Sequence, residues 1–247
     1  MAKGKRTALI TGSNKNIGRA CALALARGGC NIVVNGSKDR AAAETVAREV
    51  RALGVEAAVA MGDVGRREDC MRMAETGIAA FGAIDVLVNN AAIREDGGFL
   101  ELSEDQWRRV MAINFDASYW LARACLPGMV GRGWGRIINF AGMNAIHGYN
   151  GRAHVSASKH AAWGLTKALA KEFGPKGITS NIVSPGPIMG EAQDKVQAAH
   201  IAPMQARVPL GRLGTPDEVA AAVALLASDA GGFINGQMIQ VNGGAET

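Results

Sequence analysis

The sequence predicts an α/β fold, a Rossmann-type doubly wound parallel sheet built as a single domain over residues 1–247. Short apolar segments alternate with helical segments from the start of the chain, and no linker interrupts them. Apolar runs such as Ile32-Val-Val and Val86-Leu-Val lack two-residue alternation, as expected for strands that are covered on both faces. The length of 247 residues suits one domain of this class.

The elements follow one another in a regular order. We expect strands over residues 6–11, 31–35, 55–60, 84–89, 135–140, 178–183 and 237–241. Helices are expected over residues 17–27, 39–53, 66–81, 103–129 and 153–173, and a further helix begins at Thr215. Ser103 and Gln106 have the spacing of a capping box, and Thr215 precedes a proline and two acids that suit a first helical turn. Residues 185–209 contain four prolines beyond a strand's carboxyl end, which predicts a substrate lid.

Composition and charge exclude several classes of function. The formal charge is +5, but Lys and Arg are spread along the chain and aromatic residues are only 5%, so we expect no nucleic-acid partner. An anionic cofactor or small-molecule substrate is a better match for this charge. No apolar run of about 18 residues and no signal peptide is found, so we expect no membrane segment and a cytoplasmic location. The four cysteines are expected to be free thiols, and the histidine spacing predicts no metal site.

A glycine-containing turn follows the first strand, over residues 11–18. Such a turn directs backbone N–H groups and the positive end of a helix dipole at a pyrophosphate. The cofactor-binding residues predicted there are Gly12, Asn14, Lys15, Asn16, Ile17 and Gly18.

Two further polar segments are expected beside the same cofactor. Asp63-Val64 follows the third strand, where an acid can accept a hydrogen bond from an adenine amino group. Asn89 and Asn90 follow the fourth strand, where their amides can tie the strand ends together. Asn90 is therefore included among the cofactor-binding residues.

These features together resemble the classical short-chain dehydrogenase/reductase family over essentially the whole chain, and 3-oxoacyl-carrier-protein reductases within it. The glycine turn is similar to the family's TGxxxGxG. Four further segments resemble its NNAG motif, its central strand, its NxVxPG motif and its C-terminal signature, namely 89–92, 135–139, 181–186 and 241–244. Five matches in the family's order make the resemblance specific.

The resemblance implies an NAD or NADP cofactor, and the residues favour NADP(H) over NAD(H). The acid that would bind an NAD ribose is missing at the end of the second strand, where Asn35-Gly36-Ser37-Lys38 stands. Lys15 matches a basic position that contacts the 2′-phosphate in NADP-using relatives, and Lys38 could add to it. The resemblance extends the predicted cofactor site to Ser37, Lys38, Lys159, Pro185, Gly186 and Ile188.

Two residues depart from the family's glycines in this half. Asn16 replaces the middle glycine of the turn, and asparagine tolerates the positive φ that the turn requires. Ala92 replaces the glycine of NNAG. We expect cofactor binding to persist.

The family's catalytic group is only half present. By position, Asn114 and Lys159 match the family's asparagine and lysine. Gly142 stands at the serine position and Val155 at the tyrosine position, so both hydroxyls that would touch the substrate are lost. Lys159 would still hold the nicotinamide ribose.

The loop between Gly142 and Val155 offers substitutes. His147 or Tyr149 is the predicted replacement acid/base, because an imidazole titrates near neutrality and a phenol could replace the lost phenol. Arg152 could bind a carboxylate or phosphate. His154 could lie beside the place of the missing hydroxyl or point outward. The predicted substrate contacts are Arg94, Gly142, Arg152, His154 and Val155.

Three functions remain open at this stage. The first is an NADP(H)-dependent oxidoreductase for a carbonyl or alcohol with an atypical catalytic site. The second is a non-redox lyase, isomerase or hydrolase that uses His147, Tyr149 and Arg152 on the same scaffold. The third is a catalytically silent cofactor-binding subunit. The resemblance also implies a homotetramer or homodimer, formed through the helices near 103–129 and 153–173 and the final strand.

Overall fold

The computed structural model describes residues 5–143, 147–190 and 201–246. Its strands form one sheet in the order β3-β2-β1-β4-β5-β6-β7, and every neighbouring pair is parallel. The strands are β1 (Thr7–Ile10), β2 (Asn31–Gly36), β3 (Ala57–Met61), β4 (Val86–Asn89), β5 (Gly135–Phe140), β6 (Ile178–Pro185) and β7 (Met238–Val241). The predicted doubly wound parallel sheet is therefore confirmed.

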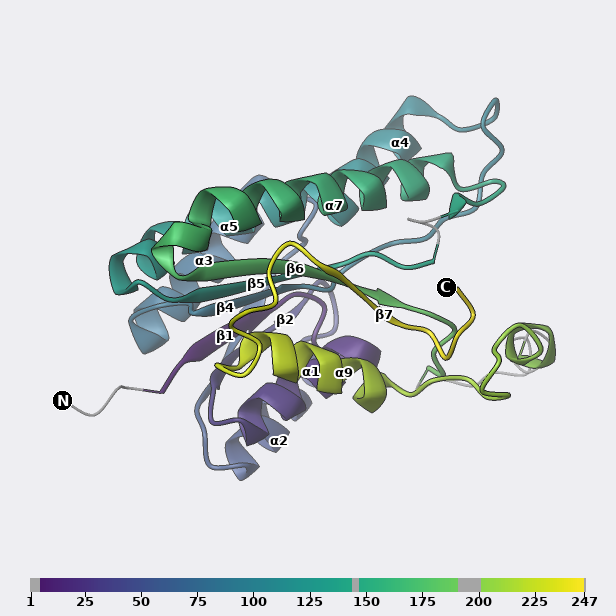
Figure 1. Cartoon of the computed structure of the whole chain (residues 1–247). Coiled ribbons are helices and arrows are strands. Elements are labelled where there is room, and N and C mark those ends of the chain that lie inside the picture. The colour runs from purple at the N-terminus through teal and green to yellow at the C-terminus, as the bar shows by residue number, and fades with distance from the viewer. Residues whose placement is uncertain (1–4, 144–146, 191–200, 247) are drawn as a thin grey trace.

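Helices cover both faces of the sheet (Figure 1). On one face lie α3 (Arg67–Phe81), α5 (Ala117–Arg132) and α7 (Ala153–Phe173). On the other lie α1 (Asn16–Arg27), α2 (Arg40–Ala52) and α9 (Pro216–Ala227), with α1 packed against α9. A short 3-10 turn, Gly174–Lys176, follows α7.

The non-alternating apolar runs are explained by this arrangement. In β1, Ile10 packs into the core beneath α1 and α9, whereas Leu9 packs into the core beneath α3 and α5. In β2, Val34 packs into the core beneath α1 and α9, and Val33 packs into the core beneath α3 and α5. All four side chains are fully buried, and each such burial stabilises the fold by about 1.5–3 kcal/mol. Both faces of the sheet need apolar residues, so two-residue alternation is absent.

The helix predicted over 103–129 is interrupted and longer than expected. It begins with α4 (Glu104–Met111), continues through a π-helical turn at Ala112–Asp116, and ends with α5 at Arg132. The predicted capping box of Ser103 and Gln106 is confirmed. The end predicted at Met129 was wrong, because Gly133 is the residue that takes a left-handed φ of 64° and terminates the helix.

The predicted lid, residues 185–209, stays a prediction, although its first residue lies in the sheet. Pro185 is the last residue of β6, paired with Val241 of β7, so it belongs to the sheet. Residues 191–200 of that segment lie outside the described residues. The remaining predicted elements agree with the structure to within about two residues.

The cysteines and the helix lengths bear on two further expectations. All four cysteines are buried free thiols, as expected. None of the helices in the described part of the chain is both long and apolar enough to cross a lipid bilayer.

Candidate active site at the carboxyl edge of the sheet

The glycine turn joins β1 to α1 with very little spare room. A Cβ atom on Gly18 would lie 2.2 Å from the carbonyl oxygen of Gly12, so only glycine fits there without a backbone shift. Gly12 has a φ of 61°, and Asn16 has a φ of 48°, which confirms that asparagine adopts the strained turn position. Lys15 is the N-cap residue of α1, but its side chain makes no capping hydrogen bond. The first turn of α1 therefore offers backbone N–H groups to a phosphate.

Two asparagine amides hold this turn. The Asn35 Oδ1 accepts a hydrogen bond from the Gly12 N–H at 2.9 Å, and its Nδ2 donates to the Ala60 carbonyl at 3.0 Å. The Asn90 Nδ2 donates to the carbonyls of Thr11 and Gly12 at 2.9 and 3.2 Å. The side chain of Asn90 thus contacts the turn that would surround a cofactor. Asn35 is buried and structural, a role that the sequence analysis missed because it treated the position only as a missing acid.

The surface beyond β2 carries two lysines. Lys15, Ser37 and Lys38 are all exposed, and Asn14 packs against Gly36 between them. The next acid in the sequence, Asp39, caps α2 by accepting a hydrogen bond from the Ala42 N–H at 2.9 Å. That carboxylate is therefore engaged by its own helix.

Asp63 is already engaged as well. Its Oδ1 accepts a hydrogen bond from the Gly65 N–H at 2.9 Å, and its Oδ2 accepts one from Arg109 at 2.7 Å. An adenine amino group would have to share this carboxylate. The neighbouring Val64 is buried and packs into the core. Adenine recognition by Asp63 and Val64 stays a prediction.

Three predicted cofactor residues follow the carboxyl end of β6 or lie on α1. Gly186 packs so closely against Asn242 that a Cβ atom would lie 2.6 Å from the Asn242 Cα. Ile188 and Ile17 are partly buried and pack against the core beneath α1 and α9. Pro185 and Gly186 thus lie at the same edge of the sheet as the glycine turn, because all strands are parallel.

Asn114 ties the loop after β4 to α7. It lies in the π-helical turn, a feature often found at functional sites. Its Oδ1 accepts a hydrogen bond from the Ile93 N–H at 2.9 Å, while its Nδ2 donates to the Ile93 carbonyl at 3.0 Å and to the Ser158 Oγ at 3.2 Å. The structure therefore brings Asn114 beside the residue that precedes Lys159.

Lys159 lies on α7, and its buried side chain reaches the end of β5. Its Nζ donates a hydrogen bond to the Phe140 carbonyl at 2.8 Å, and only 4% of the residue is exposed. Burial, and to a smaller extent the nearby positive charge of Arg94, lower the pKa of Lys159 from 10.5 to about 7. A lysine with such a pKa can exchange a proton near neutral pH.

The positions of the two missing hydroxyls differ in character. Val155 is buried on α7, one helical turn before Lys159. Gly142 follows β5 with a φ of 134°, and a Cβ atom there would meet no atom of the described residues within 4 Å. The described part of the chain therefore leaves room at Gly142, although its backbone conformation favours glycine.

The loop before α7 is joined to distant parts of the chain. The exposed His147 Nε2 forms an ion pair with the Glu246 carboxylate near the C-terminus. Arg152 donates to Asp96 at 3.1 Å, and its guanidinium lies 4.8 Å from the centre of the half-exposed Tyr149 ring. No local sequence pattern links these two carboxylates to the loop, so neither was predicted.

These contacts change two of the predicted substrate residues. Arg152, predicted to bind a substrate anion, is already paired with Asp96 and would have to release it. His154, whose direction was left open, is fully buried, and neither ring nitrogen has a hydrogen-bond partner within the described residues. Arg94 is exposed on the loop after β4. The structure thus links Asn114 to Val155 through Ser158, and Arg94 to Lys159 through charge, whereas His147 and Tyr149 are exposed.

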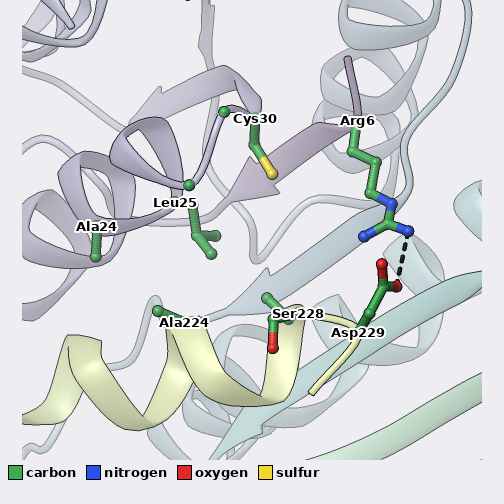
Figure 2. Close-up of a pocket in the computed structure, with 10 residues that line it drawn as sticks. Arg6, Ala24, Leu25, Cys30, Ala224, Ser228 and Asp229 are labelled. Atoms are coloured by element: carbon green, nitrogen blue, oxygen red, sulfur yellow. Dashed lines mark hydrogen bonds and ion pairs between the residues drawn. The ribbon is translucent and has the colours of Figure 1, made fainter. Parts of the chain in front are cut away.

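A cavity of about 310 Å³ lies elsewhere, between α1 and α9 (Figure 2). Arg6 and Asp229 form an ion pair of 2.8 Å at its edge, with Cys30 nearby. Arg6 and Cys30 each directly precede a parallel strand, so this cavity is at the amino edge of the sheet. It is therefore separate from the residues described above.

The chain is similar to known proteins over nearly its full length. A family model described as enoyl-(acyl carrier protein) reductase matches residues 12–246. Nodulation protein G of Azospirillum brasilense is 38% identical over 97% of this chain and 98% of its own. The 3-oxoacyl-[acyl-carrier-protein] reductase of Staphylococcus aureus is 36% identical over 98% of both chains.

Solved structures agree with this likeness. A provisionally named NAD(P)-dependent gluconate 5-dehydrogenase from Beutenbergia cavernae, with NADP bound at low occupancy, superposes with a TM-score of 0.90 at 36% identity, covering 98% of this chain and 97% of its own. A provisionally named gluconate dehydrogenase from Agrobacterium tumefaciens has a TM-score of 0.90 at 31% identity, covering 98% and 96%. Sequence, fold and the glycine turn agree: the chain belongs to the classical short-chain dehydrogenase/reductase family.

Proposed function

We propose that this chain is an NADP(H)-dependent oxidoreductase that interconverts a carbonyl and an alcohol with an atypical catalytic site. The observation that carries the proposal is the glycine turn. The turn is packed so closely that a Cβ atom on Gly18 would overlap the Gly12 carbonyl. It leads directly into α1, whose N-terminus has no side-chain cap. At the same edge of the sheet, Lys159 binds the last residue of β5 and Asn114 binds the loop that follows β4. These residues fit a dinucleotide.

The preference for NADP(H) is supported by charge. Lys15 and Lys38 are exposed where a 2′-phosphate would be bound, and Asp39 is engaged as the cap of α2. An acid that could bind the two hydroxyls of an NAD ribose is absent from Asn35 to Lys38. The NADP found in the Beutenbergia cavernae protein agrees with this preference.

The proposed division of work follows from what each residue contacts. When bound, the dinucleotide supplies or accepts a hydride. The glycine turn holds its pyrophosphate, Lys15 and Lys38 hold its 2′-phosphate, and Lys159 contacts its nicotinamide ribose. Asn114 fixes the Ile93 backbone and thereby the loop that carries Arg94. Arg94 faces the substrate from that loop.

The sequence-based candidates for the missing acid/base were His147 and Tyr149. His147 is supported by its ion pair with Glu246, because a carboxylate can orient an imidazole for proton transfer. The same pair is the one observation that favours the second candidate function, a non-redox reaction that uses His147. Tyr149 instead stacks beneath Arg152 on the exposed side of the loop.

The experiment is a screen of NADPH oxidation against carbonyl compounds. The relatives' names recommend 3-oxoacyl thioesters and oxidised gluconate as the first compounds. NADPH oxidation with at least one of them supports the proposal. Binding of NADPH without turnover of any carbonyl would favour a silent cofactor-binding subunit, and product formation without a dinucleotide would favour the non-redox function.

Assembly and location are also proposals. We propose a homotetramer or homodimer, formed through the α4–α5 segment, α7 and β7, in the cytoplasm. Sedimentation equilibrium of the full chain would test the assembly directly. A monomer at micromolar concentration would contradict it.

A further inference from the structure

We infer that Lys159 itself delivers the proton to the substrate oxygen during carbonyl reduction, in place of the two missing hydroxyl groups. The inference rests on the proposed oxidoreductase function and deepens it. It gives Lys159 a role in the chemistry beyond contact with a ribose.

The first support is the hydrogen bonding of the ammonium group. A lysine ammonium carries three N–H donors. Within the described residues, Lys159 uses one donor on the Phe140 carbonyl, and no carboxylate forms an ion pair with it. Donors thus remain for a substrate oxygen at the end of β5.

The second support is the space left by the substitutions. Val155 lies one helical turn before Lys159 on α7, where its short side chain can neither donate nor accept a proton. Gly142 follows Phe140 by two residues, and a Cβ atom on it would meet no atom of the described residues within 4 Å. A carbonyl oxygen would approach the ammonium from this side, next to the Phe140 carbonyl that Lys159 binds.

The third support is the charge around Lys159. Arg94, on the loop after β4, is the charged group that acts on Lys159. Asp96 on that loop pairs with Arg152, and Glu246 contacts His147. On the π-helical turn, burial raises the pKa of Asp116. His154, on α7 itself, is buried and has no hydrogen-bond partner among the described residues. Burial and Arg94 together bring the pKa of Lys159 to about 7, where a general acid is most effective at neutral pH.

The step is balanced without a further reagent. As the carbonyl carbon receives the hydride that the proposed dinucleotide supplies, an N–H bond of Lys159 breaks and an O–H bond forms on the product alcohol. The electron pair of the N–H bond stays on Nζ. The neutral amine then regains a proton from solvent. In the oxidative direction the neutral amine accepts the same proton.

The first test measures the titration of Lys159 in the cofactor-free protein. Trace acetylation at a series of pH values, read by mass spectrometry, gives each lysine a reactivity curve relative to its own high-pH plateau. We expect half-maximal reactivity of Lys159 near pH 7. The exposed Lys167 on the same helix is the internal control. Titration of Lys159 together with Lys167 would overturn the inference.

The second test separates proton delivery from cofactor binding. Lys159→Arg keeps a positive charge but holds its protons at all relevant pH values. We expect its Kd for NADPH, measured by fluorescence, to change less than about fivefold, whereas kcat falls by about 10²–10⁴-fold. Wild-type kcat for reduction should fall as the pH rises through about 7, and Lys159→Arg should lack this fall. Lys167→Arg is the matched control and should behave as wild type.

The outcomes are distinguishable from those of the proposed function. If the wild type reduces a carbonyl and Lys159→Arg retains kcat within threefold, the inference is overturned while the oxidoreductase stands. If His147→Ala removes the pH dependence and Lys159→Arg does not, the imidazole is the donor and the inference is again overturned. If the wild type neither binds NADPH nor reduces a carbonyl, the proposed function itself fails.

Discussion

The substitution Gly18→Ala tests how the glycine turn holds a dinucleotide. The added Cβ would lie 2.2 Å from the Gly12 carbonyl oxygen and 2.7 Å from the Asn90 Nδ2. Backbone atoms cannot yield as a flexible side chain does, so the start of α1 must move away from the turn. The Asn90 Nδ2 must also lose or lengthen its hydrogen bonds to Thr11 and Gly12.

The expected magnitude follows from these two effects. An extra methyl group in a closely packed site costs about 1–3 kcal/mol. A lost hydrogen bond of the Asn90 amide adds about 0.5–1.5 kcal/mol. We therefore expect the free energy of unfolding to fall by about 2–4 kcal/mol in a urea titration. NADPH affinity should fall by at least about tenfold, because displacement of α1 moves the N–H groups that would bind the pyrophosphate.

A glycine elsewhere provides the matched control. Gly164 lies in the middle of α7, and a Cβ atom there would meet nothing within 4 Å. Gly164→Ala should leave NADPH affinity unchanged and raise stability by up to about 1 kcal/mol, since alanine favours a helix. If Gly18→Ala has the same free energy of unfolding and the same NADPH affinity as the wild type, the reasoning about the turn is refuted.

Three further predictions concern Gly142, Lys159 and the lysine pair Lys15 and Lys38. Gly142→Ser should lower the free energy of unfolding by about 1–3 kcal/mol in a urea titration despite the open space, because serine is strained at a φ of 134°; unchanged stability would mean that the backbone relaxes freely. The pKa of Lys159 is lowered to about 7 in the folded state. Between pH 7 and about 10, Lys159 is therefore protonated in the unfolded chain and neutral in the folded chain. The free energy of unfolding should then rise with pH, by up to about 1.4 kcal/mol per pH unit. Lys159→Met should lack this contribution, and equal pH slopes for the two proteins between pH 7 and about 8.5 would contradict it. The double variant Lys15→Ala/Lys38→Ala should weaken NADPH binding by about tenfold or more and leave NADH binding nearly unchanged in fluorescence titrations; an equal loss for both cofactors would exclude a 2′-phosphate site.

The sheet could be predicted from the sequence because its signal is local. A strand covered on both faces buries apolar residues on both sides, and runs such as Ile32–Val34 show that requirement directly. The positive φ of Asn16 was predictable for the same reason, since few residues other than glycine tolerate it. Short-range steric rules were therefore sufficient to predict most of the fold and the glycine turn.

The side-chain network of the site was less predictable. Asn35 binds Gly12 and Ala60, Arg152 binds Asp96, and His147 pairs with Glu246. Each contact joins segments that are far apart in the sequence, so its existence depends on the finished fold. The π-helical turn around Asn114 and the burial that shifts Lys159 have the same origin.

The most direct test of the account is a pair of dissociation constants. NADPH and NADH are titrated separately into the wild-type chain, and binding is followed by nicotinamide fluorescence. We predict that both dinucleotides bind and that NADPH binds about tenfold or more tightly than NADH. Failure of both to bind at millimolar concentration would contradict the assignment of the carboxyl edge as a dinucleotide site, and with it the proposed function.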